Sequence, residues 1–292
     1  MGAIDAFRFV AVPLRGIATF DQGGARLNSL DTRQFEARYG YPLSGVHRAD
    51  LLSALLNELK AELRRGVDVT DIEVGDHVNV LSNVEPLGAD LLVGADGIRS
   101  RVREALGLPA KPRQSGYVAW RGVAPNATAG FSADTAGIVV GAGRHGGWVP
   151  VGGGRVYWFL TGEQGETPDP HSALDAVRGW IPDSHWGTGP VTLAGDAAHA
   201  MLPSMAQGDN QALEDAAALL SAVRQHGMSP SAFRAYEVSR QERTARLVRM
   251  SRQIMPVFQW RRTSARWLRA ALLALPQSLT QWQLEWLYWG AN

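Results

Sequence analysis

The sequence predicts an α/β fold in which two α/β segments enclose a β-rich insert and a helical region follows. Three observations support this prediction. Two short apolar runs, DLLVGAD and VTLAGD, are typical of buried strands, because neither shows the polar alternation of a half-exposed strand. Residues 116–161, between them, are aromatic, β-rich and divided by glycine-rich turns, which is typical of a mostly antiparallel sheet. After the second run the pattern is helical.

The elements before the insert follow one another closely. Residues 48–65 place leucines at helical spacing with charges on the opposite face, so we expect a helix there. VTDIEV and HVNVLS predict short strands, and the buried strand DLLVGAD comes next. IRSRVREALG then predicts a helix that ends at Gly107, since Pro109 follows. These elements form a first α/β segment, residues 1–112.

The insert and the return to α/β structure occupy the rest of the chain. Strands are predicted for GYVAWRGV, AGIVV, GGWVPV and RVYWFL, and a short helix for HSALDAVRGW, within a β-rich insert over residues 113–186. The strand VTLAGD opens a second α/β segment, residues 187–228. Residues 229–292 are predicted to be helical, and we expect breaks near residues 227–230, Pro256 and Pro276.

Composition excludes several classes of protein. Lysine plus arginine exceeds aspartate plus glutamate only by 29 to 28, so charge gives no reason to expect a nucleic-acid partner. The chain has no cysteine, which excludes disulfides and thiolate metal sites and is consistent with a cytoplasmic location. The apolar run AALLALP is too short to span a bilayer. We therefore expect a soluble protein, with membrane contact unlikely.

The most informative stretch is VTLAGDAAHAMLPSMAQGDNQALEDAAALL, residues 191–220. An apolar strand ends at Gly195 and Asp196, and a helix opens after a loop that contains Gly208. Ligands of α/β sheets bind at the carboxyl ends of strands, where helix N-termini carry partial positive charge. Asp196 is able to accept from sugar hydroxyls, and Gly208 allows a ring or phosphate to approach the backbone. The alternative is a strand–loop–helix corner in which Asp196 only caps.

The stretch GDAAHAMLPSMAQGDNQALEDA resembles the second flavin-binding motif of the single-component FAD-dependent aromatic hydroxylases, which form the para-hydroxybenzoate hydroxylase class. Within this class it is most similar to the salicylate hydroxylase and zeaxanthin epoxidase branch. GVHRADLLSALL resembles the family segment whose arginine lies beside the cofactor, and DLLVGADGIRSRVREALG resembles its Asp-Gly motif. GYVAWRGVAP and GGWVPVGGGRVYWF resemble two strands of its substrate-covering sheet. The resemblance covers nearly the whole chain and implies an incomplete Rossmann-like FAD-binding domain with an inserted substrate sheet.

The resemblance implies a role for individual residues. It places Asp196 at the ribityl and pyrophosphate region, and Pro203 with the turn before the helix against the isoalloxazine ring. The cofactor-binding residues that it implies are Arg48, Asp96, Gly97, Gly195, Asp196, Pro203, Gln207, Gly208, Asp209 and Asn210. The substrate contacts that we expect on the sheet are Trp120, Arg121, Trp148 and Tyr157. The alternatives are a surface charge for Arg48, a turn residue for Asp96 and core packing for the strand aromatics.

The sequence departs from the family pattern at three places. The family usually has Gly-Gln-Gly before the helix, whereas this chain has Ala206, whose methyl group either crowds the flavin or costs nothing if φ is negative. Family members usually have a longer stretch between Trp180 and Trp186. The dinucleotide-binding G-x-G-x-x-G of the first βαβ unit is absent. A G-x-G-x-x-G string does occur at residues 141–146, but no helix follows it, so we expect a sheet turn there.

Other possible sites are less specific. The histidines show no ligand spacing, so no metal site is predicted, and His199 is as consistent with packing as with a proton relay. Arginines recur every three residues from 240 to 252; because they wind around a helix, we expect solvated or ion-paired side chains. The Trp-rich end is expected to pack on the body of the protein or on a partner.

The resemblance implies an FAD-dependent monooxygenase. NADH or NADPH would reduce FAD, O₂ would add at flavin C4a, and the hydroperoxide would hydroxylate or epoxidise an aromatic or polyene small molecule. In such enzymes the cofactor supplies the chemistry, so no catalytic side chain is predicted. The alternative is a flavin-free, inactive remnant that acts as a binding or scaffold protein, because the phosphate-binding loop is absent. The sequence does not indicate an oligomeric state.

Overall fold

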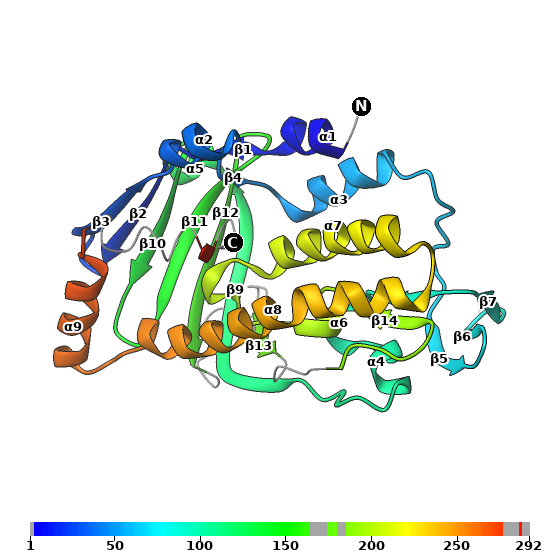
Figure 1. The fold of residues 1–292 in the computed structure, drawn as a ribbon. Coiled ribbons are helices and arrows are strands. Elements are labelled where there is room, and N and C mark those ends of the chain that lie inside the picture. Colours follow the sequence, from blue (N-terminus) through cyan, green and yellow to red (C-terminus); the bar gives the residue numbers. More distant parts are fainter. Residues whose placement is uncertain (1–2, 164–173, 180–184, 277–285, 288–292) are drawn as a thin grey trace. The chain divides into compact units, whose positions relative to one another are not determined.

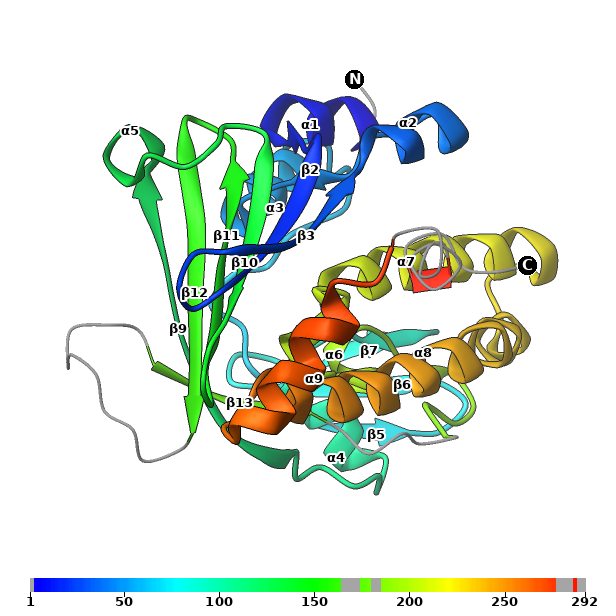
Figure 2. The ribbon, with the colours of Figure 1, turned by 90° about the vertical axis from the view of Figure 1, so that its left-hand side faces the viewer.

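The computed structural model describes residues 3–163, 174–179, 185–276 and 286–287 (Figures 1 and 2). The chain divides into two compact units. Unit 1 takes in residues 1–61, 117–175 and 257–292, and unit 2 takes in residues 62–116 and 176–256. No helix within the described ranges is both long and apolar enough to cross a membrane.

A seven-stranded sheet dominates unit 1, in the order β13-β9-β12-β11-β10-β2-β3 (Figure 2). Neighbouring strands from β9 to β10 pair antiparallel, as do β2 and β3, whereas β2 and β10 pair parallel. The mostly antiparallel sheet predicted for the insert is therefore confirmed. The bounds are β2 Gly16–Asp21, β3 Arg26–Asp31, β9 Arg113–Pro125, β10 Thr135–Val140, β11 His145–Val151, β12 Arg155–Glu163 and β13 Leu174–Gly179.

The helix predicted for HSALDAVRGW is wrong over residues 174–179, which form strand β13 beside β9. A helix of so few residues is unstable on its own, because the costly first turn is offset only by tertiary packing. The free edge of β9 offers a row of backbone hydrogen-bond partners instead. Residues 164–173 and 180–184, which include most of the short stretch between Trp180 and Trp186, lie outside the described residues.

Short helices and one small ladder complete unit 1. The helices are α1 Ala3–Val10, α2 Arg33–Tyr39, α3 Arg48–Asn57, α5 Asn126–Ala129 and α9 Thr263–Leu273, and β1 Val12–Pro13 pairs with β4 Ser44–Gly45. Helix α3 ends eight residues before the predicted Arg65. Leu59 and Leu63 are about half exposed, so this part of the leucine stripe has no core to support a helix.

Unit 2 holds two small sheets and two long helices. Strands β5, β6 and β7 form an antiparallel sheet, and β8 pairs parallel with β14. Helices α7 and α8 run side by side (Figures 1 and 2). The bounds are β5 Val69–Val74, β6 Val78–Ser82, β7 Leu87–Ala89, β8 Leu92–Gly94, η1 Gly97–Arg99, α4 Arg101–Ala105, β14 Val191–Leu193, α6 Asp196–His199, η2 Pro203–Met205, α7 Gly208–His226 and α8 Pro230–Phe258.

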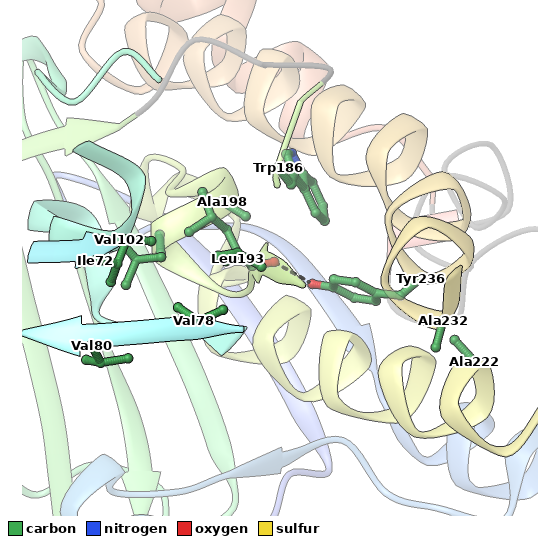
Figure 3. Packing of buried hydrophobic residues seen from close by; sticks show 12 residues of the cluster. Ile72, Val78, Val80, Val102, Trp186, Leu193, Ala198, Ala222, Ala232 and Tyr236 are labelled. Carbon is green, nitrogen blue, oxygen red and sulfur yellow. Dashed lines mark hydrogen bonds between the residues drawn. The ribbon is translucent and has the colours of Figure 1, made fainter. Parts of the chain in front are cut away.

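The core of unit 2 forms around strand β14, whose Val191 and Leu193 are fully buried (Figure 3). The hydroxyl of Tyr236 in α8 donates to the carbonyl of Leu193 at 3.2 Å, so α8 is fixed to the strand by a hydrogen bond as well as by apolar contact. The break expected near Pro256 is not observed, because Pro256 lies inside α8. Only two helical residues follow it, so the lost backbone hydrogen bond affects the last turn alone.

Candidate functional site

The carboxyl ends of β8 and β14 bring two of the predicted motifs together. Leu193 pairs with Gly94, and the Ala194 amide donates to the Gly94 carbonyl at 3.0 Å. Since the strands are parallel, the Asp96 motif and the Gly195 motif leave the sheet at the same edge. A side chain on Gly94 would meet Val102 at 2.7 Å, so this strand approaches α4 too closely for any residue except glycine. The structure thus joins the two most specific motifs of the sequence.

Asp96 orders the loop after β8. Its Oδ2 accepts from the backbone amides of Arg101 at 2.7 Å and Val102 at 3.2 Å, which caps the N-terminus of α4. Gly97 follows with φ +78°, in the left-handed region. The arrangement matches the turn-residue alternative for Asp96, and its exposed carboxylate remains at the site edge.

Gly195 begins the second motif with a backbone conformation that favours glycine, φ 58° and ψ −140°. Its amide donates to Asp215 Oδ2 at 2.8 Å, and its carbonyl accepts from Ala198 and His199, which starts helix α6. Asp196 is the exposed first residue of α6. The strand therefore turns sharply at Gly195 and presents Asp196 to the outside of the corner.

A buried network of charged side chains holds the turn at Gly195 in place. Asp215 of α7 is 1% exposed, and its carboxylate accepts hydrogen bonds from His199 Nε2 at 2.6 Å and Arg240 Nε at 2.8 Å. Burial alone would raise the pKa of Asp215, but the hydrogen bonds from His199, Arg240 and the Gly195 amide outweigh it and lower the pKa. Asp215 is thus held ionised, and it links the Gly195 turn to both long helices.

Sequence reasoning missed Asp215 as a functional residue, left His199 between packing and a proton relay, and expected Arg240 to be solvated or ion-paired. His199 is 5% exposed and packed against Trp186, with ring centroids 5.3 Å apart. The expectation that the arginines are solvated or ion-paired is confirmed for Arg240 and Arg243, both paired with Glu214, and for Arg249, which is exposed. The available signal was the acidic pair Glu214 and Asp215, followed directly by the apolar run AAALL in α7.

The departure at Ala206 has a structural consequence. Pro203 opens the single turn η2, and Ala206 ends it with φ 51° and ψ 36°. Ala206 is the one non-glycine residue with positive φ among those described. Of the two alternatives for Ala206, the one that requires negative φ is therefore excluded: the residue adopts the left-handed conformation, at a cost of about 1 kcal/mol.

The N-terminus of α7 fits a ligand rich in hydrogen-bond acceptors. Gln207, the residue before the helix, makes no side-chain cap, and its Nε2 is buried without a partner among the described residues. A methyl group on Gly208 would meet nothing within 4 Å, so there is space beside the first turn. Asp209 and Asn210 are exposed. These features suit a flavin, whose ring and phosphates carry many acceptors.

The remaining candidates lie in unit 1. Arg48 is the exposed first residue of α3, and its guanidinium has no ion pair or hydrogen bond with the described residues. Strand register separates the four sheet candidates, because directly paired residues share a face and neighbours along a strand do not. Arg121 pairs with Phe159, two residues from Tyr157, on one face. Trp120 and Trp148 lie on the opposite face.

The packing of the two tryptophans favours a core role. Trp120 is 3% exposed. The ring of Trp148 lies over Gly137 and stacks on Phe131 and Phe20, with ring centroids 4.4 and 5.8 Å apart. A single substrate is therefore unable to contact all four predicted side chains on one surface of the sheet.

The G-x-G-x-x-G string at residues 141–146 connects β10 to β11 as a hairpin, which confirms the predicted sheet turn. The Gly141 amide donates to the Arg144 carbonyl at 2.8 Å, and the Gly141 carbonyl accepts from Arg269 at 2.8 Å. Arg261 lies against Gly143. Within the described residues there is also no cluster of potential metal ligands.

Comparison with known proteins gives a consistent result. The model of the FAD binding domain family matches residues 1–176 and 183–251. The chain is similar to aurachin C monooxygenase/isomerase of Stigmatella aurantiaca, with 31% identity over 95% of this chain and 81% of that protein. It is also similar to 3-hydroxybenzoate 6-hydroxylase of Klebsiella oxytoca, with 31% identity over 91% of this chain and 77% of that protein.

A solved structure shares the fold. Klebsiella pneumoniae HpxO, crystallised with FAD and uric acid, superposes with a TM-score of 0.84 at 26% sequence identity. The match covers 94% of this chain and 80% of HpxO.

Proposed function

This chain belongs to the family of FAD-dependent aromatic-ring monooxygenases, and we propose that it binds FAD at the corner formed by residues 195–210 and oxidises a small aromatic molecule with O₂. The observation that carries the proposal is the N-terminus of α7, where a buried amide donor and open space at Gly208 adjoin the ends of β8 and β14. When bound, FAD supplies the oxygen-activating chemistry.

In this proposal the residues of the chain bind the cofactor and orient it. The backbone amides of the first turn of α7 would hold an electron-rich part of the cofactor, because a helix N-terminus carries partial positive charge. Asp96 and Asp196, exposed at the edge of the corner, accept from sugar hydroxyls of the cofactor. Gly97, Gly195, Pro203, Asp209 and Asn210 shape the surrounding backbone. Arg48 is assigned to the cofactor by the family resemblance alone.

The substrate is proposed to be an aromatic or heteroaromatic compound, and NADH or NADPH the reductant. The relatives support this class, since one of them is named a 3-hydroxybenzoate 6-hydroxylase and HpxO was crystallised with uric acid. We assign substrate contact to the sheet face that carries Arg121 and Tyr157. Arg121 is exposed on this face, and a guanidinium suits the carboxylate or polarised carbonyl of such a substrate.

Spectroscopy of the purified chain tests the proposal. Addition of FAD should give flavin absorption bands that remain after gel filtration, and NADH or NADPH should bleach them. A hydroxybenzoate and uric acid, supplied one at a time with the reductant and O₂, test whether the chain releases an oxygenated aromatic product. A chain that stays colourless with excess FAD would overturn the proposal and favour the flavin-free binding protein.

A further inference from the structure

Gln207 carries a buried amide whose orientation is set by a chain of hydrogen bonds from α8. The side chain is 1% exposed, and its Nε2 has no partner among the described residues. Its Oε1 accepts from Gln211 Nε2 at 3.3 Å, and Gln211 Oε1 accepts from Arg240 Nη2 at 2.7 Å. The three side chains form a relay that runs from Arg240 in α8, through Gln211, to the start of α7.

The orientation of Gln211 follows from its two charged neighbours. A guanidinium only donates, so the atom of Gln211 that faces Arg240 must be its carbonyl oxygen. The other end of the amide meets Glu214 Oε1 at 2.8 Å, and a carboxylate only accepts. Although burial raises the pKa of Glu214, hydrogen bonds from Arg243 and Arg240 lower it below the ordinary value. The donor Arg240 and the acceptor Glu214 therefore fix which end of the Gln211 amide is the nitrogen.

The orientation of Gln207 follows in turn. Gln211 directs its second N–H at Gln207, so Gln207 must turn its oxygen toward Gln211. The reverse orientation would place two NH₂ groups against each other. The NH₂ group of Gln207 is thus directed away from the relay, beside the N-terminus of α7. A buried donor without an acceptor is destabilising, and such groups are rare in folded proteins unless a ligand completes them.

We propose that Gln207 is the hydrogen-bond donor for an acceptor atom of the flavin ring, and that Arg240 is a positioning residue that sets this donor through Gln211. The inference rests on the proposed function, because it takes FAD as the ligand of the corner. It assigns to α8 a part in cofactor recognition through an arginine that lies on neither motif. Arg240 is held in place by Asp215 at 2.8 Å and Glu214 at 2.6 Å.

The first experiment replaces the donor. Gln207→Met keeps the length of the side chain and removes its hydrogen bonds, and Gln225→Met makes the same change on the exposed side of α7 as a control. Titration of flavin fluorescence should show that Gln207→Met weakens the binding of both FAD and FMN about tenfold, whereas Gln225→Met binds both as the wild type does. The urea midpoint of the ligand-free Gln207→Met protein should equal or exceed that of the wild type, because an unsatisfied donor is removed.

The second experiment tests the relay. Gln211→Met releases Gln207 to rotate and should weaken FAD binding about threefold. In a background that already carries Gln207→Met, the Gln211→Met change should cause no further loss, since the relay acts only through Gln207. Additive losses would show that Gln211 has a merely structural role and would overturn the relay.

The outcomes separate the inference from the proposed function. A wild-type chain that fails to bind FAD overturns the proposed function and the choice of flavin as ligand. A wild-type chain that binds FAD while Gln207→Met binds it equally well overturns the donor role alone. A loss seen with FAD and not with FMN would move the acceptor from the ring to the adenosine half and contradict the proposal.

Discussion

Two glycine-bearing segments follow strands in this protein, and only one of them has the features of a ligand site. Residues 141–146 carry the complete G-x-G-x-x-G string, yet they form a hairpin between antiparallel strands. Residues 195–210 lack that string, yet they lead from a parallel strand to the N-terminus of a 19-residue helix. The glycine pattern therefore predicts a nucleotide site only where strand direction and a following helix support it.

The polar contacts of the two segments differ in the same way. At the hairpin, Arg269 and Arg261 occupy the turn, and Arg269 donates to the Gly141 carbonyl. At the corner, the charged side chains are buried behind the backbone: Asp215 accepts a hydrogen bond from the Gly195 amide and pairs with Arg240. The outer side of the corner is left with space beside Gly208 and a buried donor on Gln207.

The largest expected effect comes from removing the buried charge of Asp215. Asp215→Asn should lower the free energy of unfolding by about 3 kcal/mol, because it leaves buried Arg240 and His199 without their shared carboxylate. Glu163→Gln is the control near the hairpin, where Glu163 pairs with Arg261 in a half-exposed ion pair. That change should cost less than about 1 kcal/mol in urea denaturation. Equal losses of unfolding free energy in Asp215→Asn and Glu163→Gln would contradict the proposed difference between a buried charge at the corner and an exposed one at the hairpin.

The next effect concerns the hairpin and depends on pH. Burial, together with the nearby charge of Arg269, lowers the pKa of His145 to about 4. Because the unfolded chain binds this proton more readily, stability should fall as pH decreases from about 6.5 to 4, by roughly 3 kcal/mol in total. His145→Gln should remove most of this pH dependence in urea denaturation. His77→Gln, at an exposed site, should not change it; an unchanged slope in His145→Gln would contradict the assignment.

A third effect compares the two glycines directly. Gly208→Ala should not lower the stability of the ligand-free chain, since the added methyl meets nothing within 4 Å and alanine restricts the unfolded state more than glycine does. It should weaken FAD binding about tenfold, or about 1.4 kcal/mol, because the methyl enters the space we assign to the cofactor. Gly141→Ala at the hairpin should bind FAD as the wild type does. Reversal of the two results in a flavin titration would exclude the corner.

The smallest expected effect is at Ala206. Ala206→Gly should stabilise the chain by about 0.5 kcal/mol, because relief of the left-handed strain exceeds the entropy that glycine gains in the unfolded state. The urea midpoint should rise slightly. A loss of stability instead would mean that the Ala206 methyl makes packing contacts that outweigh the strain.

Local patterns predicted much of the fold. The strands of the insert and the helices after residue 207 follow from periodicity within single segments, and both are present. Strand β2 was not anticipated, because its place depends on parallel pairing with β10, more than one hundred residues away. The same holds for β13, where pairing with β9 overrides a helical pattern.

The corner itself was predictable because its residues are contiguous in sequence. Its support was not, because Asp215 and Arg240 become partners only when α7 packs against α8. The arginine spacing showed that the side chains wind around α8, but not which of them faces inward. The split of Trp148 from Tyr157 likewise required strand register, which periodicity alone does not give.

Hydrogen–deuterium exchange with and without FAD tests the central claim most directly. If the corner is the flavin site, FAD should slow the exchange of amides within residues 195–210, above all in the first turn of α7, and leave residues 141–146 unchanged. Protection at residues 141–146 without protection at the start of α7 would contradict the account.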